Sequence, residues 1–108
     1  MGRRKEFERV FREGRRGSTR LVTVWAVPGD GAGVRVGFAI GRRVGRAVVR
    51  NRIRRRLRAA LAEELAGVPA GTDLVIAARE VCLDAEFGTL REALRAALKK
   101  AGAWIDSA

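Results

Sequence analysis

The spacing of hydrophobic residues along the chain predicts three helices and three strands. In the helical segments apolar side chains recur every three or four positions, and in the strand segments β-branched and apolar residues dominate. In chain order the predicted elements are a helix over 4–12, strands over 21–27 and 34–40, a helix over 46–65, a strand over 73–78 and a helix over 87–98. The order α-β-β-α-β-α predicts an α+β sandwich, in which helices pack on one small sheet.

Turn residues between these elements predict how the first two strands pair. Gly14 and Gly17 end the first helix, and Pro28-Gly29 ends the first strand. The short segment DGAG then leads into the second strand, which predicts an antiparallel hairpin. The third strand (DLVIAA) is almost continuously apolar, as expected for a strand in the interior of a sheet.

The helix over 46–65 combines a core-facing stripe with the strongest run of charge in the chain. Nine arginines lie between Arg42 and Arg58, and no acidic residue interrupts them. So many like charges repel one another at short range, whereas each guanidinium group matches phosphate oxygens in pairs. The run therefore predicts an exposed surface for a polyanionic partner. The core-facing stripe comprises Val49, Ile53, Leu57, Ala60, Leu61 and the pair Glu64-Leu65.

Length and charge fit one nucleic-acid-binding domain. The chain has 108 residues, enough for a single compact domain over 1–108 with a modest core. Its formal net charge is +11, and residues 1–58 hold 18 basic and 4 acidic side chains against 5 and 8 in residues 59–108. A basic surface built by one half of the chain is typical of proteins that bind nucleic acid.

The residue types that the chain lacks exclude several other classes. There is no histidine, the commonest general base and metal ligand. The single cysteine, Cys82, forms no internal disulfide or cysteine–zinc cluster, and we expect it in the core or at its boundary. No apolar run approaches the roughly 20 residues of a membrane-spanning helix. We therefore expect a cytoplasmic protein with no membrane partner and no catalytic or metal-binding side chains of its own.

The centre of the arginine run is the block Arg50-Asn51-Arg52, which Arg54-Arg55-Arg56 follows. Its guanidinium groups would engage phosphates, while Asn51 would form a hydrogen bond with a base edge or a sugar. A merely solvated basic face is the alternative, although ordinary surfaces mix both signs of charge. A membrane-surface helix would need its apolar side for lipid, and here the core needs it. A DNA-reading helix stays open on the chemistry of arginine alone.

Three aromatic residues form a second candidate site. Phe7, Phe11 and Trp25 would either belong to the core or provide surfaces on which the bases of a single strand stack. Spacing alone does not decide between these roles. If the first helix and the first strand line such a groove, then Arg9, Arg12 and Arg20 are expected at its edge.

The loop before the second helix and the acidic residues of the second half could each have a functional or a purely structural role. The segment from Gly41 to Arg46 leads into a helix, so its backbone N–H groups would either meet phosphate or form a simple turn. The acidic residues of the second half are dispersed, which predicts solvated side chains and no paired-carboxylate catalytic site. They include Glu63, Glu64, Glu80, Asp84 and Glu86.

The segment Gly41–Arg58 (GRRVGRAVVRNRIRRRLR) resembles the signature of the protein subunit of bacterial ribonuclease P. The motif Phe-x-x-Val-Phe from Phe7 to Phe11 and the strand end at Ala78-Arg79 are also similar, so the resemblance covers roughly residues 5–98. The chain departs from the family pattern at a few positions. These are Gly41 where Ser is usual, Arg46 where Asn is common, Arg56 where Leu is frequent, and Trp25 in place of Tyr or Phe.

The resemblance implies an accessory subunit of an endoribonuclease whose RNA subunit performs the chemistry. That RNA removes the 5′ leader of precursor tRNA with the help of Mg²⁺, and no cofactor is expected on the protein's side chains. The implied partners are the catalytic RNA and the precursor tRNA leader, with no DNA, and the implied fold has an unusual left-handed β-α-β crossover. The residues implied to bind the catalytic RNA are Arg42, Arg43, Arg46, Arg50, Asn51, Arg52, Arg54 and Arg55. Those implied to line a central leader-binding cleft are Phe7, Phe11, Arg20 and Trp25.

Two other functions remain as rivals to this expectation. One is a structural RNA-binding protein of the ribosomal or assembly type, and the other is a basic DNA-binding regulator. A leader-binding protein differs from both because it should bind precursor tRNA more tightly than mature tRNA.

Overall fold

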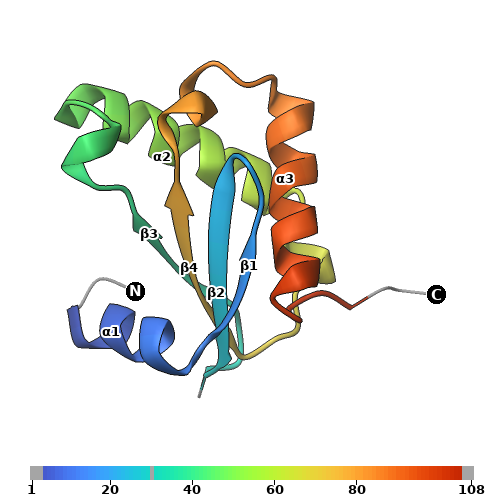
Figure 1. Ribbon diagram of the computed structural model, residues 1–108. Helices are drawn as coiled ribbons and strands as arrows, with labels where there is room; N and C mark the ends of the chain where they lie inside the picture. The colour runs from blue at the N-terminus through green and yellow to red at the C-terminus, as the bar shows by residue number, and fades with distance from the viewer. Residues whose placement is uncertain (1–3, 30, 106–108) are drawn as a thin grey trace.

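The computed structural model describes residues 4–29 and 31–105 and has three α-helices and a four-stranded sheet (Figure 1). This architecture confirms the predicted α+β class. The helices are α1 (Arg4–Glu13), α2 (Ala47–Ala62) and α3 (Phe87–Lys100). The strands are β1 (Arg15–Ser18), β2 (Val22–Pro28), β3 (Arg35–Ala39) and β4 (Thr72–Ala78), and the short 3-10 helices are η1 (Arg42–Val44), η2 (Leu65–Gly67) and η3 (Glu80–Leu83).

The pairing of the strands differs from the predicted hairpin. The order in the sheet is β1-β2-β4-β3, so β4 lies between β2 and β3. It pairs antiparallel with β2 and parallel with β3, whereas β2 forms its hairpin with β1. The hairpin prediction was wrong because β4 is the most apolar strand and is buried from Thr72 to Ile76, which favours a central position. The extra strand β1 (RRGS) contains no hydrophobic residue, so periodicity gives no sign of it.

The parallel pair β3 and β4 is joined through α2 in a left-handed crossover. With α1 towards the viewer, as in Figure 1, both strands point upward, β4 lies to the right of β3, and α2 passes behind the sheet. This is the crossover that the family resemblance implied, and it is opposite to the hand that general rules of chain connection favour.

Both faces of the sheet are covered, but unequally. The main core lies between the sheet and the two long helices, and residues such as Val24, Leu74, Ile53 and Leu94 are fully buried there. The opposite face, which we call the α1 face, carries a much smaller cluster built on Val10, Val27 and Val75. The short helix α1 therefore has little hydrophobic area with which to hold its position.

The end of α2 also departs from the predicted stripe. The helix stops at Ala62, and the following turn leaves Leu65 36% exposed while Glu64 is 3% exposed. The prediction that Glu64 is solvated was wrong, because its carboxylate accepts hydrogen bonds from Arg91 and Arg95 of α3 at 3.0–3.1 Å. This ion-pair group fastens the end of α2 to α3.

Strand β1 approaches α3 so closely that only glycine fits at one position. A Cβ atom on Gly17 would lie 2.1 Å from the carbonyl oxygen of Ala97 and 2.6 Å from the backbone nitrogen of Ala101. Because both atoms belong to the backbone, no side-chain rotation relieves the clash. The strand β1, which sequence periodicity missed, can therefore pack against α3 only because Gly17 has no side chain.

We predict that Gly17→Ala destabilises the fold by about 2–4 kcal/mol, because a backbone clash forces β1 away from α3. The matched control is Gly88→Ala in the first turn of α3, where an added Cβ meets no atom within 4 Å. That variant should equal or exceed the wild-type stability, because alanine favours helix. Denaturant unfolding measures both, and equal stability of the two variants would contradict the close approach.

Candidate nucleic-acid interface

The arginine run forms an exposed surface over η1 and α2. Ile53 and Leu57 of α2 are completely buried, so the opposite side of the helix faces outward. Within residues 4–29 and 31–105, no acidic side chain forms an ion pair with any arginine of this run. Of the eight predicted RNA-binding residues, Arg42, Arg43, Arg46, Asn51, Arg52 and Arg55 are exposed, and Arg50 and Arg54 are half-buried.

One arginine of the run, Arg56, has an internal role instead. Its guanidinium group donates hydrogen bonds to the backbone carbonyl oxygens of Cys82, Leu83 and Ala85, with 2.9 Å to that of Leu83. These carbonyls belong to η3 and the turn after it, so Arg56 fastens that segment to α2. Cys82 itself is buried in the core, where desolvation raises the pKa of its thiol.

The side chain of Asn51 is oriented by its neighbour on the helix. Arg54 Nη1 donates a hydrogen bond to Asn51 Oδ1 at 2.7 Å, as residues three positions apart can on one helix face. The carbonyl oxygen of the Asn51 amide is thereby engaged, and its NH₂ group, which donates no hydrogen bond within the described residues, is open to acceptors outside the protein. Phosphate, 2′-hydroxyl and base carbonyl oxygens are such acceptors.

The loop before α2 leaves the start of that helix without a side-chain cap. Arg46 is the N-cap residue and its side chain makes no capping hydrogen bond, while Gly45 has the positive φ of 153°. A Cβ on Gly45 would also press on the side chain of Val49 at 3.0–3.1 Å. The uncapped N–H groups fit either a phosphate or water, so both alternatives for this loop remain.

The predicted aromatic residues come together on the α1 face. Phe11 meets Trp25 edge-on with ring centroids 4.8 Å apart, and Phe7 lies 6.5 Å from Phe11. Phe11 is 40% exposed, whereas Phe7 and Trp25 are half-buried. Phe7 packs against Gly37, where a Cβ would come within 2.6 Å of the phenyl ring. The three rings thus form a partly solvated row rather than a closed core.

Arginine 16 joins this row, and sequence analysis did not single it out. The guanidinium carbon of Arg16 lies 6.0 Å from the centroid of the Trp25 ring, within cation–π range. The antiparallel register pairs Arg16 directly with Trp25, so only knowledge of strand β1 could have shown the contact. Arg20 is exposed in the turn between β1 and β2.

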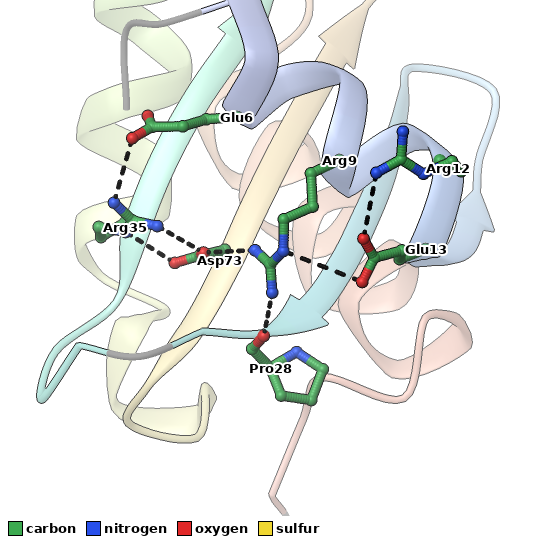
Figure 2. Close-up of polar contacts among 7 residues, drawn as sticks. All are labelled: Glu6, Arg9, Arg12, Glu13, Pro28, Arg35 and Asp73. Carbon is green, nitrogen blue, oxygen red and sulfur yellow. Dashed lines mark hydrogen bonds and ion pairs between the residues drawn. The ribbon is translucent and has the colours of Figure 1, made fainter.

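A buried carboxylate links α1 to the sheet (Figure 2). The side chain of Asp73 on β4 is 2% exposed and accepts hydrogen bonds from Arg35 at 2.7 and 2.9 Å and from Arg9 at 3.1 Å. Arg9 also donates to the carbonyl oxygen of Pro28 at 2.8 Å, and Glu6 of α1 lies 3.5 Å from Arg35. The carboxylate thus links α1, β3 and β4.

The Asp73 contacts change the electrostatics of the α1 face. The hydrogen bond from Arg35 holds the pKa of Asp73 below its ordinary value, and this effect outweighs the burial that raises it. Arg9 is therefore committed to an internal ion pair, and Arg12 lies 3.4 Å from Glu13. Of the residues expected at the edge of a groove, Arg9 pairs with the buried Asp73, whereas the side chain of Arg12 is 72% exposed beside Glu13. Their place at the edge of a groove stays a prediction.

Taken together, an arginine helix with no acidic partners in the described chain and a row of aromatic rings define a small basic nucleic-acid-binding protein. A family model described as Ribonuclease P matches residues 1–102. The chain therefore belongs to the ribonuclease P family, which gives it an RNA partner and a role in the processing of precursor tRNA. A search of curated proteins found no match.

Solved structures agree with this family. The RNase P protein from Staphylococcus aureus is 22% identical, with a TM-score of 0.81 over 96% of this chain and 95% of that chain. The RNase P protein from Thermotoga maritima is 26% identical, with a TM-score of 0.76 over 85% and 87% of the two chains. The same Thermotoga protein in complex with 1-(4-fluorophenyl)-2-thiourea is 25% identical, with a TM-score of 0.78 over 88% and 92%.

We predict that Asp73→Asn destabilises the protein by about 3 kcal/mol near pH 7, the lower end for a broken buried pair because both arginines still reach water. The carboxylate has a lowered pKa, so its contribution is complete above its ordinary pKa of 3.8 and is lost as the pH falls further. The stability difference between wild type and variant should therefore shrink below about pH 4. Urea unfolding across pH measures it, and a difference that grows towards low pH would contradict the assignment.

Proposed function

We propose that the chain is the protein subunit of ribonuclease P, that the exposed face of α2 binds the catalytic RNA, and that the α1 face binds the 5′ leader of precursor tRNA. Family membership supports the assembly and the substrate class. The observation that carries the division of labour is the separation of two surfaces. The α2 surface is cationic, whereas the α1 face presents a row of aromatic rings, where Arg9 and Arg35 pair with Asp73 and Arg16 lies at the Trp25 end of the row.

Docking of the catalytic RNA on α2 is supported by the chemistry of the exposed arginines. RNA helices are recognised largely through their phosphates and 2′-hydroxyl groups, and guanidinium groups engage phosphate in a bidentate manner. Arg52 and Arg55 are exposed and have no acidic partner in the described chain, so RNA phosphates would relieve their mutual repulsion. Asn51 adds an oriented amide donor at the centre of this surface.

Leader binding on the α1 face is supported by the aromatic row. Base–aromatic stacking tolerates every sequence, as a subunit that meets many different leaders requires. Phe11 offers a partly exposed ring edge-on to Trp25, and Arg16 supplies a cation at the end of the row. Mature tRNA has no leader and would not occupy this face.

We place the hydrolysis on the RNA and its Mg²⁺ ions. The chain contains no histidine, and among residues 4–29 and 31–105 no three acidic or cysteine side chains gather in a group suited to a metal ion. The protein would instead position substrate and screen phosphates near the RNA. Helices long and apolar enough to cross a membrane are not found in the described part of the chain. We propose the cytoplasm as the place of action.

We predict that the protein stimulates precursor cleavage when it is reconstituted with a ribonuclease P RNA at low Mg²⁺ concentration, because its arginines replace part of the ionic screening. Single-turnover cleavage with and without protein measures the effect. An absence of stimulation would reject the proposal and favour a structural RNA-binding role.

We predict different effects for two arginines of one helix. Arg52→Ala should lower the slope of log K against log salt for assembly with the RNA by about one, because one RNA phosphate then has no guanidinium partner. Arg56→Ala should lower protein stability and leave that slope unchanged, because Arg56 donates to carbonyl oxygens within the protein. Equal slopes for wild type and Arg52→Ala would show that Arg52 does not meet the RNA.

We predict that Phe11→Ala lowers the preference of the holoenzyme for precursor over mature tRNA by about 5- to 150-fold, the reduction expected for one stacked base. Phe87→Ala is the matched control, because Phe87 is also 40% exposed but lies on α3. Competitive binding of the two tRNAs measures the preference. If both variants retain it, the leader does not stack on Phe11.

A further inference from the structure

The strand register shows in which direction the aromatic row crosses the sheet. On the α1 face, Gly37 of β3 pairs with Val75 of β4, Val75 with Trp25 of β2, and Trp25 with Arg16 of β1. Phe7 lies over Gly37, and Phe11 lies against Trp25. The rings therefore run from β3 to β2, and the row reaches the β1 edge of the sheet at a cation, Arg16.

Beyond Arg16 the β1 edge carries further basic side chains. We call Arg15, Arg16, Arg20 and Lys100 the β1-edge strip, and all four are exposed. Lys100 lies in the last turn of α3 and donates a hydrogen bond to the carbonyl oxygen of Ser18 at 3.0 Å, so α3 contributes a cation to the edge of β1. The Arg15 guanidinium lies beside Gly102, 2.7 Å from the position of a Cβ there. The strip thus continues from the α1 face round the edge to the end of α3.

The strip differs from most of the basic surface in having no acidic partners. Within the described residues, none of its four cations forms an ion pair. Elsewhere outside the α2 surface, arginines that face solvent are commonly neutralised by a carboxylate. Examples are Arg4 with Glu8, Arg12 with Glu13, Arg91 with Glu63 and Arg95 with Glu64.

We propose that the β1-edge strip binds the sugar–phosphate backbone of the leader after the leader has left the aromatic row. The proposal rests on the leader-binding role of the α1 face. Neighbouring strands are about 4.8 Å apart and a stacked strand advances about 3.4 Å per phosphate, so one or two nucleotides separate Trp25 from the strip. Stacking on the aromatic row binds bases of any sequence, and the cations of the strip bind the phosphates. Other grooves for single-stranded nucleic acid combine the same two interactions.

In this binding mode the β1-edge strip binds the substrate and not the catalytic RNA. A strip that holds the distal leader contributes affinity only when the leader is long enough to reach it. A strip that docks the catalytic RNA contributes equally for every leader length and also for mature tRNA. Leader length therefore separates the two occupants.

The test uses holoenzymes with wild-type protein, Lys100→Ala or Arg15→Ala/Lys100→Ala, and precursor tRNAs whose leaders are lengthened one nucleotide at a time. The matched control is Lys99→Ala, which removes the same charge from the same helical turn but lies over Trp104, at 5.9 Å from the ring centroid. We expect wild type and Lys99→Ala to gain affinity with each added nucleotide until the strip is reached and filled. The two strip variants should stop gaining one or two nucleotides earlier.

Salt dependence gives a second readout with a defined size. For each leader phosphate that no longer meets a cation, the weakening of long-leader binding between about 50 and 200 mM salt should be about 2.6-fold smaller than in wild type. Short leaders should show no such difference. If affinity depends on leader length in the same way for wild type and all variants, the proposed role of the strip is wrong. It is also wrong if the strip variants lose the same affinity at every leader length. Wild-type protein that fails to stimulate cleavage at all would instead overturn the proposed function, and the strip with it.

Discussion

The buried carboxylate of Asp73 decides where α1 lies, and the aromatic row depends on that position. Helix α1 has ten residues and only one fully buried side chain, Val10, so neither intrinsic helicity nor hydrophobic burial holds it firmly. Asp73 offers two oxygens to guanidinium groups from α1 and β3, in a place where water barely competes. Phe7 and Phe11, which α1 carries, therefore reach Gly37 and Trp25.

The same interaction explains how a protein with a net charge of +11 keeps one face suited to bases. Pairing with Asp73 engages Arg9 and Arg35 within the protein, so Phe7 and Phe11 offer mainly stacking surfaces, and Arg16 supplies a cation at the Trp25 end of the row. The excess charge is concentrated on α2 and on the β1-edge strip, whose cations form no ion pairs within the described residues. Such concentrations repel internally and are relieved by a polyanion, which couples RNA binding to the stability of the protein.

Much of this architecture could be predicted from the sequence, because it rests on local periodicity. All three helices and the strands β2, β3 and β4 follow from the spacing of apolar residues, and the exposed arginines follow from the core stripe on α2. The family resemblance supplied the crossover. Long-range pairing was beyond such reasoning. The position of β4 between β2 and β3 depends on which strand best tolerates burial on both faces, and β1 is fixed by the close approach of Gly17 to α3.

The individual roles of charged residues were the least predictable part. Sequence alone treats Arg52 and Arg56 alike, yet the structure turns Arg56 towards carbonyl oxygens of the segment after β4. Likewise Glu64 looked solvated and Asp73 looked like one polar position in an apolar strand, whereas each is buried against two arginines. Such assignments depend on partners 26 to 64 residues away along the chain.

The central claim is that two different RNAs meet two different surfaces of this one domain. Site-specific crosslinking tests it most directly, with a photoreactive phenylalanine analogue placed either at Phe11 on the α1 face or at Arg55 on α2. In the assembled holoenzyme with precursor tRNA, position 11 should crosslink to the leader, and position 55 should crosslink to the catalytic RNA. Crosslinks from both positions to the same RNA molecule, or an exchange of the two partners, would contradict the account.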